Sequence, residues 1–186
     1  MAYLNKFLIG ILQPGAAVLE LGCGAGVPCT QKLISSGLKV TGVDISSAQV
    51  DLAREHVPQA TLIHGDMMSL EFKAGTFDAI VAFYSVFHLP KDEQGPMLRK
   101  MAQWLCEGGI LLFNLGTNEG DHYIEDWMGA KMFSSGLGTD GNREMLKMFG
   151  EDLVIEDEVA VELVGGFEER FHWVWAVKNL KSNVVS

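Results

Sequence analysis

Short apolar runs alternate with stretches of helical periodicity along most of this chain of 186 residues. A short, continuous apolar run is typical of a strand that is buried on both faces of a parallel sheet. Strands separated by helices pair in parallel, through right-handed crossovers. The expected strands are residues 16–22, 39–44, 60–66, 77–84 and 108–115, and the expected helices are residues 3–12, 27–36, 49–55 and 91–105. The alternation therefore predicts an α/β fold.

The C-terminal part follows a different pattern. Two apolar-polar runs, residues 152–164 and 167–178, are separated by a short glycine turn, which predicts an antiparallel hairpin. The fold expected is thus a Rossmann-like, doubly wound sheet of seven strands, mostly parallel, with an antiparallel C-terminal hairpin and helices on both faces. We expect one domain over residues 1–186, divided into an N-terminal helix (1–14), a cofactor-binding core (15–115), a substrate lid (116–150) and the C-terminal hairpin (151–178).

Composition narrows the range of partners. The formal net charge of −10 opposes binding to a phosphate backbone, which relies on basic side chains, so we expect no nucleic-acid partner. No apolar run approaches the roughly 18 residues needed to cross a bilayer, so we expect no membrane partner and a cytoplasmic location. The three cysteines form no C-x-x-C pair, which favours buried thiols in a reducing compartment. We expect a monomer or a homodimer.

Three glycines at alternate positions, Gly22, Gly24 and Gly26, directly follow the first expected strand. Such a cluster indicates positive φ angles or a close approach to the main chain. An open parallel sheet binds its ligand beyond the carboxyl ends of its strands, so these glycines predict a ligand cleft. The spacing G-x-G-x-G differs from the dinucleotide pattern G-x-G-x-x-G, and no Tyr-x-x-x-Lys run is present; both disfavour a nicotinamide oxidoreductase.

Acidic residues stand at the end of each of the first three strands: Glu20, Asp44 and Asp66. At the position of Asp44, a carboxylate can accept hydrogen bonds from both hydroxyls of a ribose. A carboxylate at residue 66 can meet the exocyclic amine of an adenine. Helix capping by Asp44 and a plain turn at Asp66 are the alternatives. The preferred interpretation is an adenosine site.

These runs resemble the class I S-adenosylmethionine-dependent methyltransferases. The matching stretches, in the family's order, are "VLELGCGAG", "VTGVDIS", "HGDMMSL", "FDAIVAFYSVFHL" and "LCEGGILLF". The resemblance implies S-adenosylmethionine as cofactor and S-adenosylhomocysteine as product. It implies that the glycine backbone packs against the methionine part, oriented by Glu20, and that Asp44 holds the ribose. The other cofactor-binding residues that it implies are Ile45 beside the adenine, Asp66 and Met67 at the adenine edge, and Phe83 at the methionine end.

Two histidines are candidates for catalysis, because His88 follows the fourth strand and His122 follows the fifth. Each could remove a proton from a substrate or hydrogen-bond to the backbone. No histidine pair has metal-ligand spacing, so no metal is expected. The candidate substrate-pocket residues are Tyr84, His88, His122, Trp127, Met128 and Met132. The apolar residues of segment 116–150 fit either a lid, with residues 134–141 as its hinge or exposed loop, or the inner faces of two helices.

The expected reaction is methyl transfer to an oxygen, nitrogen, sulfur or carbon atom of a small molecule. One alternative is a cofactor-binding protein without transfer chemistry, acting as a partner subunit or as a pericyclic catalyst. The other is a nucleic-acid or protein methyltransferase. Enzymes that methylate a base amine carry an Asn/Asp-Pro-Pro-aromatic motif after the fourth strand, where this chain reads "AFYS".

Overall fold

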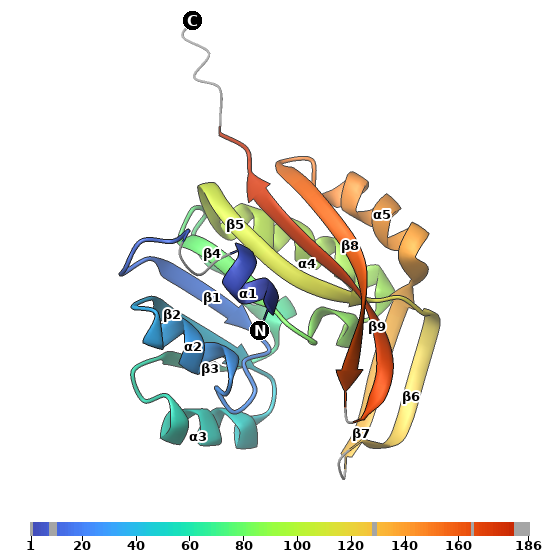
Figure 1. Cartoon of the computed structure of the whole chain (residues 1–186), viewed down its shortest axis with the longest axis horizontal. Coiled ribbons are helices and arrows are strands. Elements are labelled where there is room, and N and C mark those ends of the chain that lie inside the picture. Colours follow the sequence, from blue (N-terminus) through green and yellow to red (C-terminus); the bar gives the residue numbers. More distant parts are fainter. Residues whose placement is uncertain (1, 8–10, 128–129, 165, 181–186) are drawn as a thin grey trace, which may run out of the picture.

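The computed structural model describes residues 2–7, 11–127, 130–164 and 166–180. Its main feature is a seven-stranded sheet in the order β3-β2-β1-β4-β5-β9-β8 (Figure 1). These strands are β1 (Ala17–Leu21), β2 (Lys39–Asp44), β3 (Thr61–His64), β4 (Phe77–Ala82), β5 (Leu105–Gly116), β8 (Leu153–Val164) and β9 (Phe167–Lys178). The neighbouring strands among β3, β2, β1, β4 and β5 pair in parallel. Strand β9 is antiparallel to both β5 and β8. The expected Rossmann-like fold with a C-terminal hairpin is therefore confirmed.

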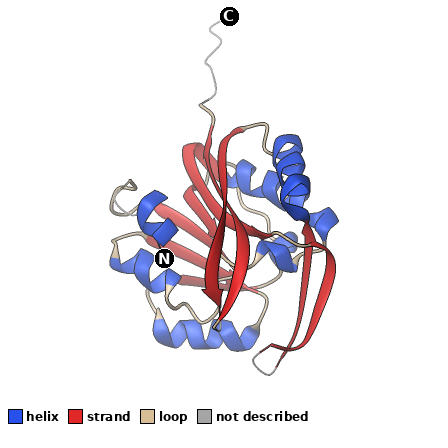
Figure 2. Ribbon diagram, turned by 45° about the vertical axis from the view of Figure 1, so that its right-hand side comes forward, coloured by secondary structure: helices blue, strands red, loops and turns tan. Residues whose placement is uncertain are grey.

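Helices pack on both faces of the sheet (Figure 2). They are α1 (Ala2–Phe7), α2 (Cys29–Ser35), α3 (Ser47–His56), α4 (Lys91–Trp104) and α5 (Gly138–Phe149), with short 3₁₀ turns η1 (Met67–Ser69) and η2 (Val86–His88). One buried cluster includes Leu4 of α1 and Leu33 of α2, and the other includes side chains of α4 and α5. Among the described residues, no helix combines the length and apolar character that a membrane span requires.

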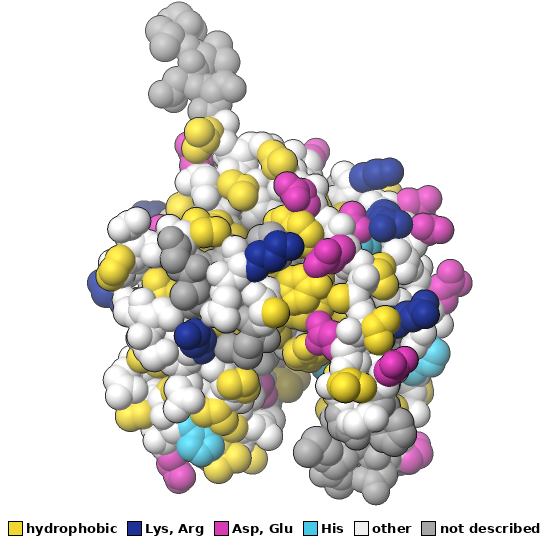
Figure 3. All heavy atoms as spheres, viewed as in Figure 1, with side chains coloured by type: hydrophobic (Ala, Val, Ile, Leu, Met, Phe, Trp, Pro, Cys, Tyr) yellow, Lys and Arg dark blue, Asp and Glu magenta, His cyan; other side chains and the backbone are white. Residues whose placement is uncertain are grey.

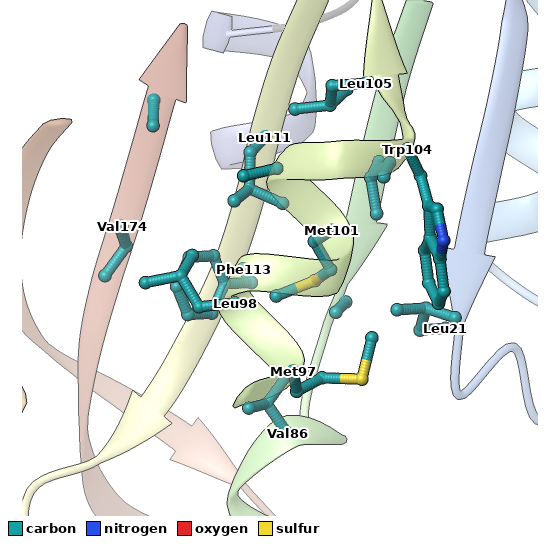
Figure 4. Close-up of a cluster of buried hydrophobic side chains, with 14 of the residues drawn as sticks. Leu21, Val86, Met97, Leu98, Met101, Trp104, Leu105, Leu111, Phe113 and Val174 are labelled. Atoms are coloured by element: carbon teal, nitrogen blue, oxygen red, sulfur yellow. The ribbon is translucent and has the colours of Figure 1, made fainter. Parts of the chain in front are cut away.

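The two clusters lie on opposite faces of β5. Leu111 and Phe113 point toward α4, where they contact a cluster with Met101, Leu98 and Trp104 (Figure 4). Ile110 and Leu112 belong to the cluster on the other face. Because successive side chains of a strand alternate between faces, a strand covered on both sides must be apolar throughout. This is why the central strands are recognisable as continuous apolar runs.

Segment 116–150 differs from its sequence-based interpretation. Strands β6 (Glu119–Trp127) and β7 (Ala130–Leu137) pair as a separate antiparallel sheet, which we call the ribbon. Tyr123 lies opposite Phe133 and Ile124 opposite Met132, and such cross-strand pairs stabilise strands over helices. The alternative of two helices is therefore wrong for Glu119–Trp127 and Ala130–Leu137. Of the apolar residues that suggested helical faces, Met132 and Phe133 belong to facing pairs of the ribbon, whereas Met145 and Met148 lie on a helix, α5.

Residues 134–141 do not form the expected hinge or exposed loop. Ser134–Leu137 completes β7, α5 begins at Gly138, and Ser135 is buried. Met145 lies in the core, whereas Met148 is exposed on the outer face of α5. The amphipathic pattern of α5 thus explains the methionines without a pocket.

Two smaller expectations are also corrected. Cys23 and Cys29 are buried, but Cys106, expected to be buried, is only partly so. It lies in the irregular start of β5, where the pairing with β4 shifts register between Leu105 and Ile110. The N-terminal helix, expected over residues 3–12, covers Ala2–Phe7, and its expected residues 8–10 lie outside the described residues.

Candidate functional site

The glycine loop between β1 and α2 adopts positive φ angles at Gly22 (+78°), Gly24 (+53°) and Gly26 (+77°). A Cβ at Gly22 would overlap the Cβ of Ser85, and a Cβ at Gly26 would lie 2.5 Å from Val57 Cγ2. At Gly24 the nearest atom to such a Cβ lies 3.8 Å away. Two of the glycines therefore permit close packing, whereas a Cβ at Gly24 would make only an ordinary contact, with Gln49, so the backbone at Gly24 is the least crowded of the three.

Asp44 connects the end of β2 to this loop. Its Oδ2 accepts a hydrogen bond from the backbone N–H of Gly24 at 2.8 Å, and its Oδ1 accepts one from Ser46 at 2.9 Å. A carboxylate oxygen has two lone pairs, so each oxygen keeps one acceptor site. The next residue, Ile45, is 72% exposed although it is large and apolar. An acceptor pair beside an apolar surface fits a ribose that carries an adenine.

Glu20 lies beneath the loop and is 3% exposed. Thr30 donates a hydrogen bond from its Oγ1 to Glu20 Oε2 at 2.6 Å. Burial raises the pKa of Glu20 to about 7, and the nearby Asp44 adds to the increase, while hydrogen bonds from Thr30 and Cys29 partly offset it. The carboxyl group therefore couples β1 to the start of α2 and supports the loop from inside the protein.

Asp66 and Met67 follow β3 at the same edge of the sheet. Asp66 Oδ1 accepts a hydrogen bond from the backbone N–H of Met68 at 2.9 Å and so caps the 3₁₀ turn η1. This turn role matches the alternative weighed from the sequence. Among the described residues, none hydrogen-bonds to the other oxygen of Asp66, which leaves an acceptor beside the loops.

Two histidines hydrogen-bond to the backbone of the loops that follow β1 and β2. His56 Nδ1 lies 2.9 Å from the carbonyl oxygen of Ala25 in the glycine loop, and His64 Nε2 lies 3.1 Å from that of Ile45. Each ring nitrogen must carry a proton to donate to a carbonyl. Both histidines therefore support the loop backbone.

A cavity of about 660 Å³ lies between η2, the ribbon and the turn end of the C-terminal hairpin. We call it the ribbon cavity. Its aromatic wall is formed by Tyr84, Phe87 and Phe171, and the ribbon contributes Asp121 and His122 among other side chains. Figure 3 shows the surface hollowed between the lobe that carries α3 and the lobe that carries the ribbon. The cavity thus combines an apolar wall with polar groups opposite, an arrangement common in small-molecule sites.

Four of the candidate substrate-pocket residues line this cavity, namely Tyr84, His88, His122 and Met132. The side chain of Trp127 and the whole of Met128 lie outside the described residues. Sequence reasoning missed Phe87, Phe171, Asn118 and Arg170, which also line the cavity. Phe171 belongs to the alternating pattern of β9, but nothing local indicates that the beginning of β9 lies beside η2.

His88 and His122 both hydrogen-bond to the backbone, which is the second of the two roles considered from the sequence. His88 Nδ1 lies 2.5 Å from the carbonyl oxygen of Phe133 in β7, and His122 Nε2 lies 3.1 Å from that of Glu119. Because the carbonyl accepts, His88 carries its proton on Nδ1, and Nε2 of the neutral ring keeps a free lone pair. Each histidine is thus fixed by the backbone and lines the cavity.

Phe83, Tyr84 and Ser85 join the glycine loop to the ribbon cavity. Ser85 packs on Gly22 and donates a hydrogen bond from its Oγ to the carbonyl oxygen of Leu21 at 2.8 Å. Tyr84, the preceding residue, lines the cavity. A ligand on the loop and a ligand in the cavity would therefore lie on either side of a three-residue segment.

Among the described residues, no group of three or more His, Cys, Asp and Glu side chains is arranged to hold a metal ion.

Known proteins to which this chain is similar are methyltransferases. Residues 18–109 match the family model described as a methyltransferase domain. An uncharacterized methyltransferase of Anoxybacillus flavithermus is 33% identical over 101 residues, which cover 54% of this chain and 47% of that protein. Sterol methyltransferase-like 2 of Botryococcus braunii is 38% identical over 89 residues, 45% of this chain and 23% of that protein. The chain thus matches less than half the length of these curated relatives.

Among solved structures, an S-adenosylmethionine-dependent methyltransferase from Methanosarcina mazei superimposes with a TM-score of 0.79 at 20% identity. The superposition covers 91% of this chain and 95% of that one. At this identity the likeness establishes the fold, which extends beyond the part that the family model matches.

Proposed function

Since residues 18–109 match a methyltransferase domain and the fold matches that of a solved S-adenosylmethionine-dependent methyltransferase, we propose that this chain is a class I S-adenosylmethionine-dependent methyltransferase and that it methylates a small molecule held in the ribbon cavity. The methyl donor is S-adenosylmethionine, and the acceptor atom is an oxygen, nitrogen, sulfur or carbon. The observation that carries this proposal is the contact of Ser85 with Gly22, because Ser85 directly follows Tyr84, which belongs to the wall of the cavity. The reaction takes place in the cytoplasm, where the three free thiols stay reduced.

The size and lining of the cavity support a small-molecule acceptor. Its volume of about 660 Å³ lies within the range of about 300–1,000 Å³ that is common for such sites. The name of the relative from Botryococcus braunii also refers to a small molecule, a sterol. The net charge of −10 disfavours a nucleic-acid acceptor.

Each loop residue has a proposed part in holding the cofactor. Asp44 accepts hydrogen bonds from the ribose hydroxyls, and Ile45 covers the adenine. Asp66 and Met67 lie at the adenine edge, and Phe83 borders the methionine end. The glycine backbone carries the methionine part, with Gly24 as the least crowded position and Gly22 and Gly26 as packing positions. Glu20 supports that backbone from beneath.

The bound cofactor supplies a methyl group that its sulfonium already activates. The protein has to align the acceptor and exclude water, and alignment of this kind can lower a barrier by roughly 7–11 kcal/mol. His88 takes the acceptor proton on Nε2, because Nδ1 is committed to the Phe133 carbonyl. This step matters only for an acceptor that is protonated at neutral pH. His122 is the second candidate for the same task.

Calorimetric titration with S-adenosylmethionine and S-adenosylhomocysteine, followed by methyl transfer to a panel of small acceptors, tests the proposal. Micromolar binding by the wild type that Asp44→Ala abolishes, followed by methyl transfer, supports it. Binding without transfer to any acceptor would favour the cofactor-binding alternative. Absence of binding by the wild type would overturn the proposal.

A further inference from the structure

Tyr84 holds an unusual backbone conformation at the junction of the two parts of the site. Its φ is +52°, and it is the one non-glycine residue with positive φ in the part of the chain that the structure describes. This left-handed region is disfavoured for residues with a Cβ and persists only where the surroundings impose it. The contacts that impose it on Tyr84 therefore matter for the shape of the ribbon cavity.

Two hydrogen bonds fix Tyr84 at its two ends. Its backbone N–H donates to Oδ1 of the buried Asn114 at 2.7 Å, and its hydroxyl donates to Oε2 of Glu162. The ring lies edge-on to Phe171, with ring centres 5.0 Å apart, and edge-on to Trp173 at 6.1 Å. The side chain is thus held along its whole length between β5 and the C-terminal hairpin.

Glu162 of β8 is itself held by a second donor. Trp173 Nε1 donates to Glu162 Oε1 at 2.6 Å, so both carboxylate oxygens accept a hydrogen bond from an aromatic side chain. Burial and the neighbouring Glu162 raise the pKa of Tyr84 above its usual value. The Tyr84 hydroxyl therefore stays protonated and continues to donate.

We propose that Glu162 is a positioning residue that fixes Tyr84 as the wall between the glycine loop and the ribbon cavity. This inference rests on the proposed function for its role in methyl transfer. Because the hydroxyl of Tyr84 donates its hydrogen bond to Glu162, Tyr84 presents its ring to the cavity. The acceptor therefore meets an apolar surface at this wall, continued by Phe87 and Phe171. Glu162 lies outside the family-model match of residues 18–109, so the hairpin sets this wall separately from the cofactor loops.

The chain offers a matched control on the same strand. Glu158 lies four residues earlier in β8, on the same face, and Oε1 of Glu158 accepts a hydrogen bond from the hydroxyl of Tyr3 at 2.7 Å. Removing either carboxylate breaks one tyrosine hydrogen bond to the hairpin. Tyr3 does not line the ribbon cavity, so the two variants separate an effect on the wall from a general effect on the hairpin.

The test uses ¹⁹F NMR of protein labelled with 3-fluorotyrosine. The chain has three tyrosines, so three resonances are expected, and each is assigned by its Tyr→Phe variant. Glu162→Ala should shift and broaden the Tyr84 resonance, and Glu162→Gln should return it toward the wild-type position because the amide can still bond to both aromatic groups. Glu158→Ala should leave the Tyr84 resonance in place and shift that of Tyr3.

S-adenosylhomocysteine serves as the probe of the connection to the glycine loop. In the wild type, saturation with it should shift the Tyr84 resonance through Ser85 and Gly22. In Glu162→Ala the added shift should be lost, while the dissociation constant stays within about threefold of the wild type. An unchanged Tyr84 resonance in Glu162→Ala, or an equal change in Glu158→Ala, would overturn the inference. The spectra recorded without ligand test only whether Glu162 fixes Tyr84. Failure of the wild type to bind S-adenosylhomocysteine would instead overturn the proposed function.

Discussion

The carboxylate of Asp44 accepts a hydrogen bond from the backbone N–H of Gly24 at 2.8 Å. This bond orders the glycine loop before any ligand arrives. The other carboxylate oxygen of Asp44 accepts a hydrogen bond from the backbone N–H of Ser46, so two donors converge on one side chain. The same residue is proposed to hold the ribose, and it therefore both shapes the loop and recognises the ligand.

Asp44→Asn is expected to weaken S-adenosylmethionine binding about as much as Asp44→Ala does. An asparagine replaces one acceptor oxygen by an NH₂ donor, which would face a backbone N–H. Loss of a hydrogen bond to a charged group costs about 1.5–3 kcal/mol, or roughly ten- to a hundredfold in the dissociation constant. Calorimetric titration measures this, with the exposed Asp51 of α3 changed to Asn as control. Wild-type affinity in Asp44→Asn would contradict the assignment.

Replacement of the loop glycines by alanine should separate stability from binding. A Cβ at Gly26 meets Val57 at 2.5 Å, whereas a Cβ at Gly24 has its nearest neighbour at 3.8 Å, an ordinary van der Waals contact. Gly24→Ala then carries only the conformational cost of positive φ, about 1–2 kcal/mol, and should lose cofactor affinity. Gly26→Ala adds a steric overlap and should lower the melting temperature more. Equal melting temperatures for the two variants would show that the loop relaxes around residue 26.

Glu20 predicts an unusual dependence of stability on pH. Burial raises the pKa of its carboxyl to about 7 in the folded protein, above the value of about 4.3 for a free glutamate. Between these values the folded state binds more protons than the unfolded state, so the contribution of Glu20 to stability falls as the pH rises from about 4.5 to 7. Glu20→Gln should therefore be more stable than the wild type at pH 8, by up to about 3 kcal/mol.

Urea unfolding at pH 5 and at pH 8 measures this difference. The variant keeps a side-chain oxygen that can accept the Thr30 hydroxyl. Glu107→Gln, at an exposed position, serves as the control. If the difference in stability between Glu20→Gln and the wild type is the same at both pH values, the carboxyl of Glu20 ionises at a common pKa in both states.

The pair of Asp157 and His172 predicts a dependence of stability on pH that is opposite in sign to that of Glu20. His172 is fully buried and its Nε2 lies 2.7 Å from Asp157 Oδ2. Burial opposes ionisation of Asp157, but hydrogen bonds from His172 and Arg143 outweigh it and hold the pKa of this carboxyl below its usual value. Such a group stabilises the fold above its unfolded-state pKa, and the contribution is lost as the pH falls through the folded-state pKa.

Asp157→Asn should accordingly lower the melting temperature at pH 7, and the deficit should shrink at pH 3. Asp140→Asn is the matched control, because Asp140 also faces Arg143, at 3.7 Å, but is almost fully exposed. An equal deficit at both pH values would mean that Asp157 stabilises the fold by packing alone.

The glycine loop and its neighbouring acids, the proposed cofactor side, could be located in the fold from the sequence because their signals are local. The glycines at 22, 24 and 26 and the acid at 44 follow apolar runs of recognisable length, and the sheet brings the ends of those runs to one edge. The acceptor side depends on contacts between distant residues. Tyr84 meets Glu162 across 78 positions, and no periodicity within either segment signals that contact.

The ribbon illustrates the same limit. Tyr123 and Phe133, or Ile124 and Met132, suit a strand only once each faces its partner. Read along one segment, aromatic residues and methionines at these spacings fit a helix face equally well. Cross-strand pairing, which tertiary structure supplies, decides between the two.

His88→Gln should separate turnover from binding. The glutamine amide can still donate to the carbonyl of Phe133, which His88 Nδ1 meets at 2.5 Å, so the anchor of β7 is retained. It offers no basic nitrogen, however. For an acceptor that must lose a proton, turnover should fall by about 10²- to 10⁴-fold, while S-adenosylmethionine affinity stays unchanged because His88 lines the ribbon cavity and not the glycine loop.

The pH profile of turnover distinguishes loss of the base from loss of position. If Nε2 of His88 accepts the proton, the fall of the wild-type rate at low pH should be absent in His88→Gln, and His122→Gln should keep it. His88→Phe, which removes both the base and the donor to Phe133, should in addition raise the acceptor KM because β7 loses an anchor to η2. A wild-type profile in His88→Gln would transfer the proposed role to His122, and normal turnover in both single variants would leave alignment as the protein's whole contribution.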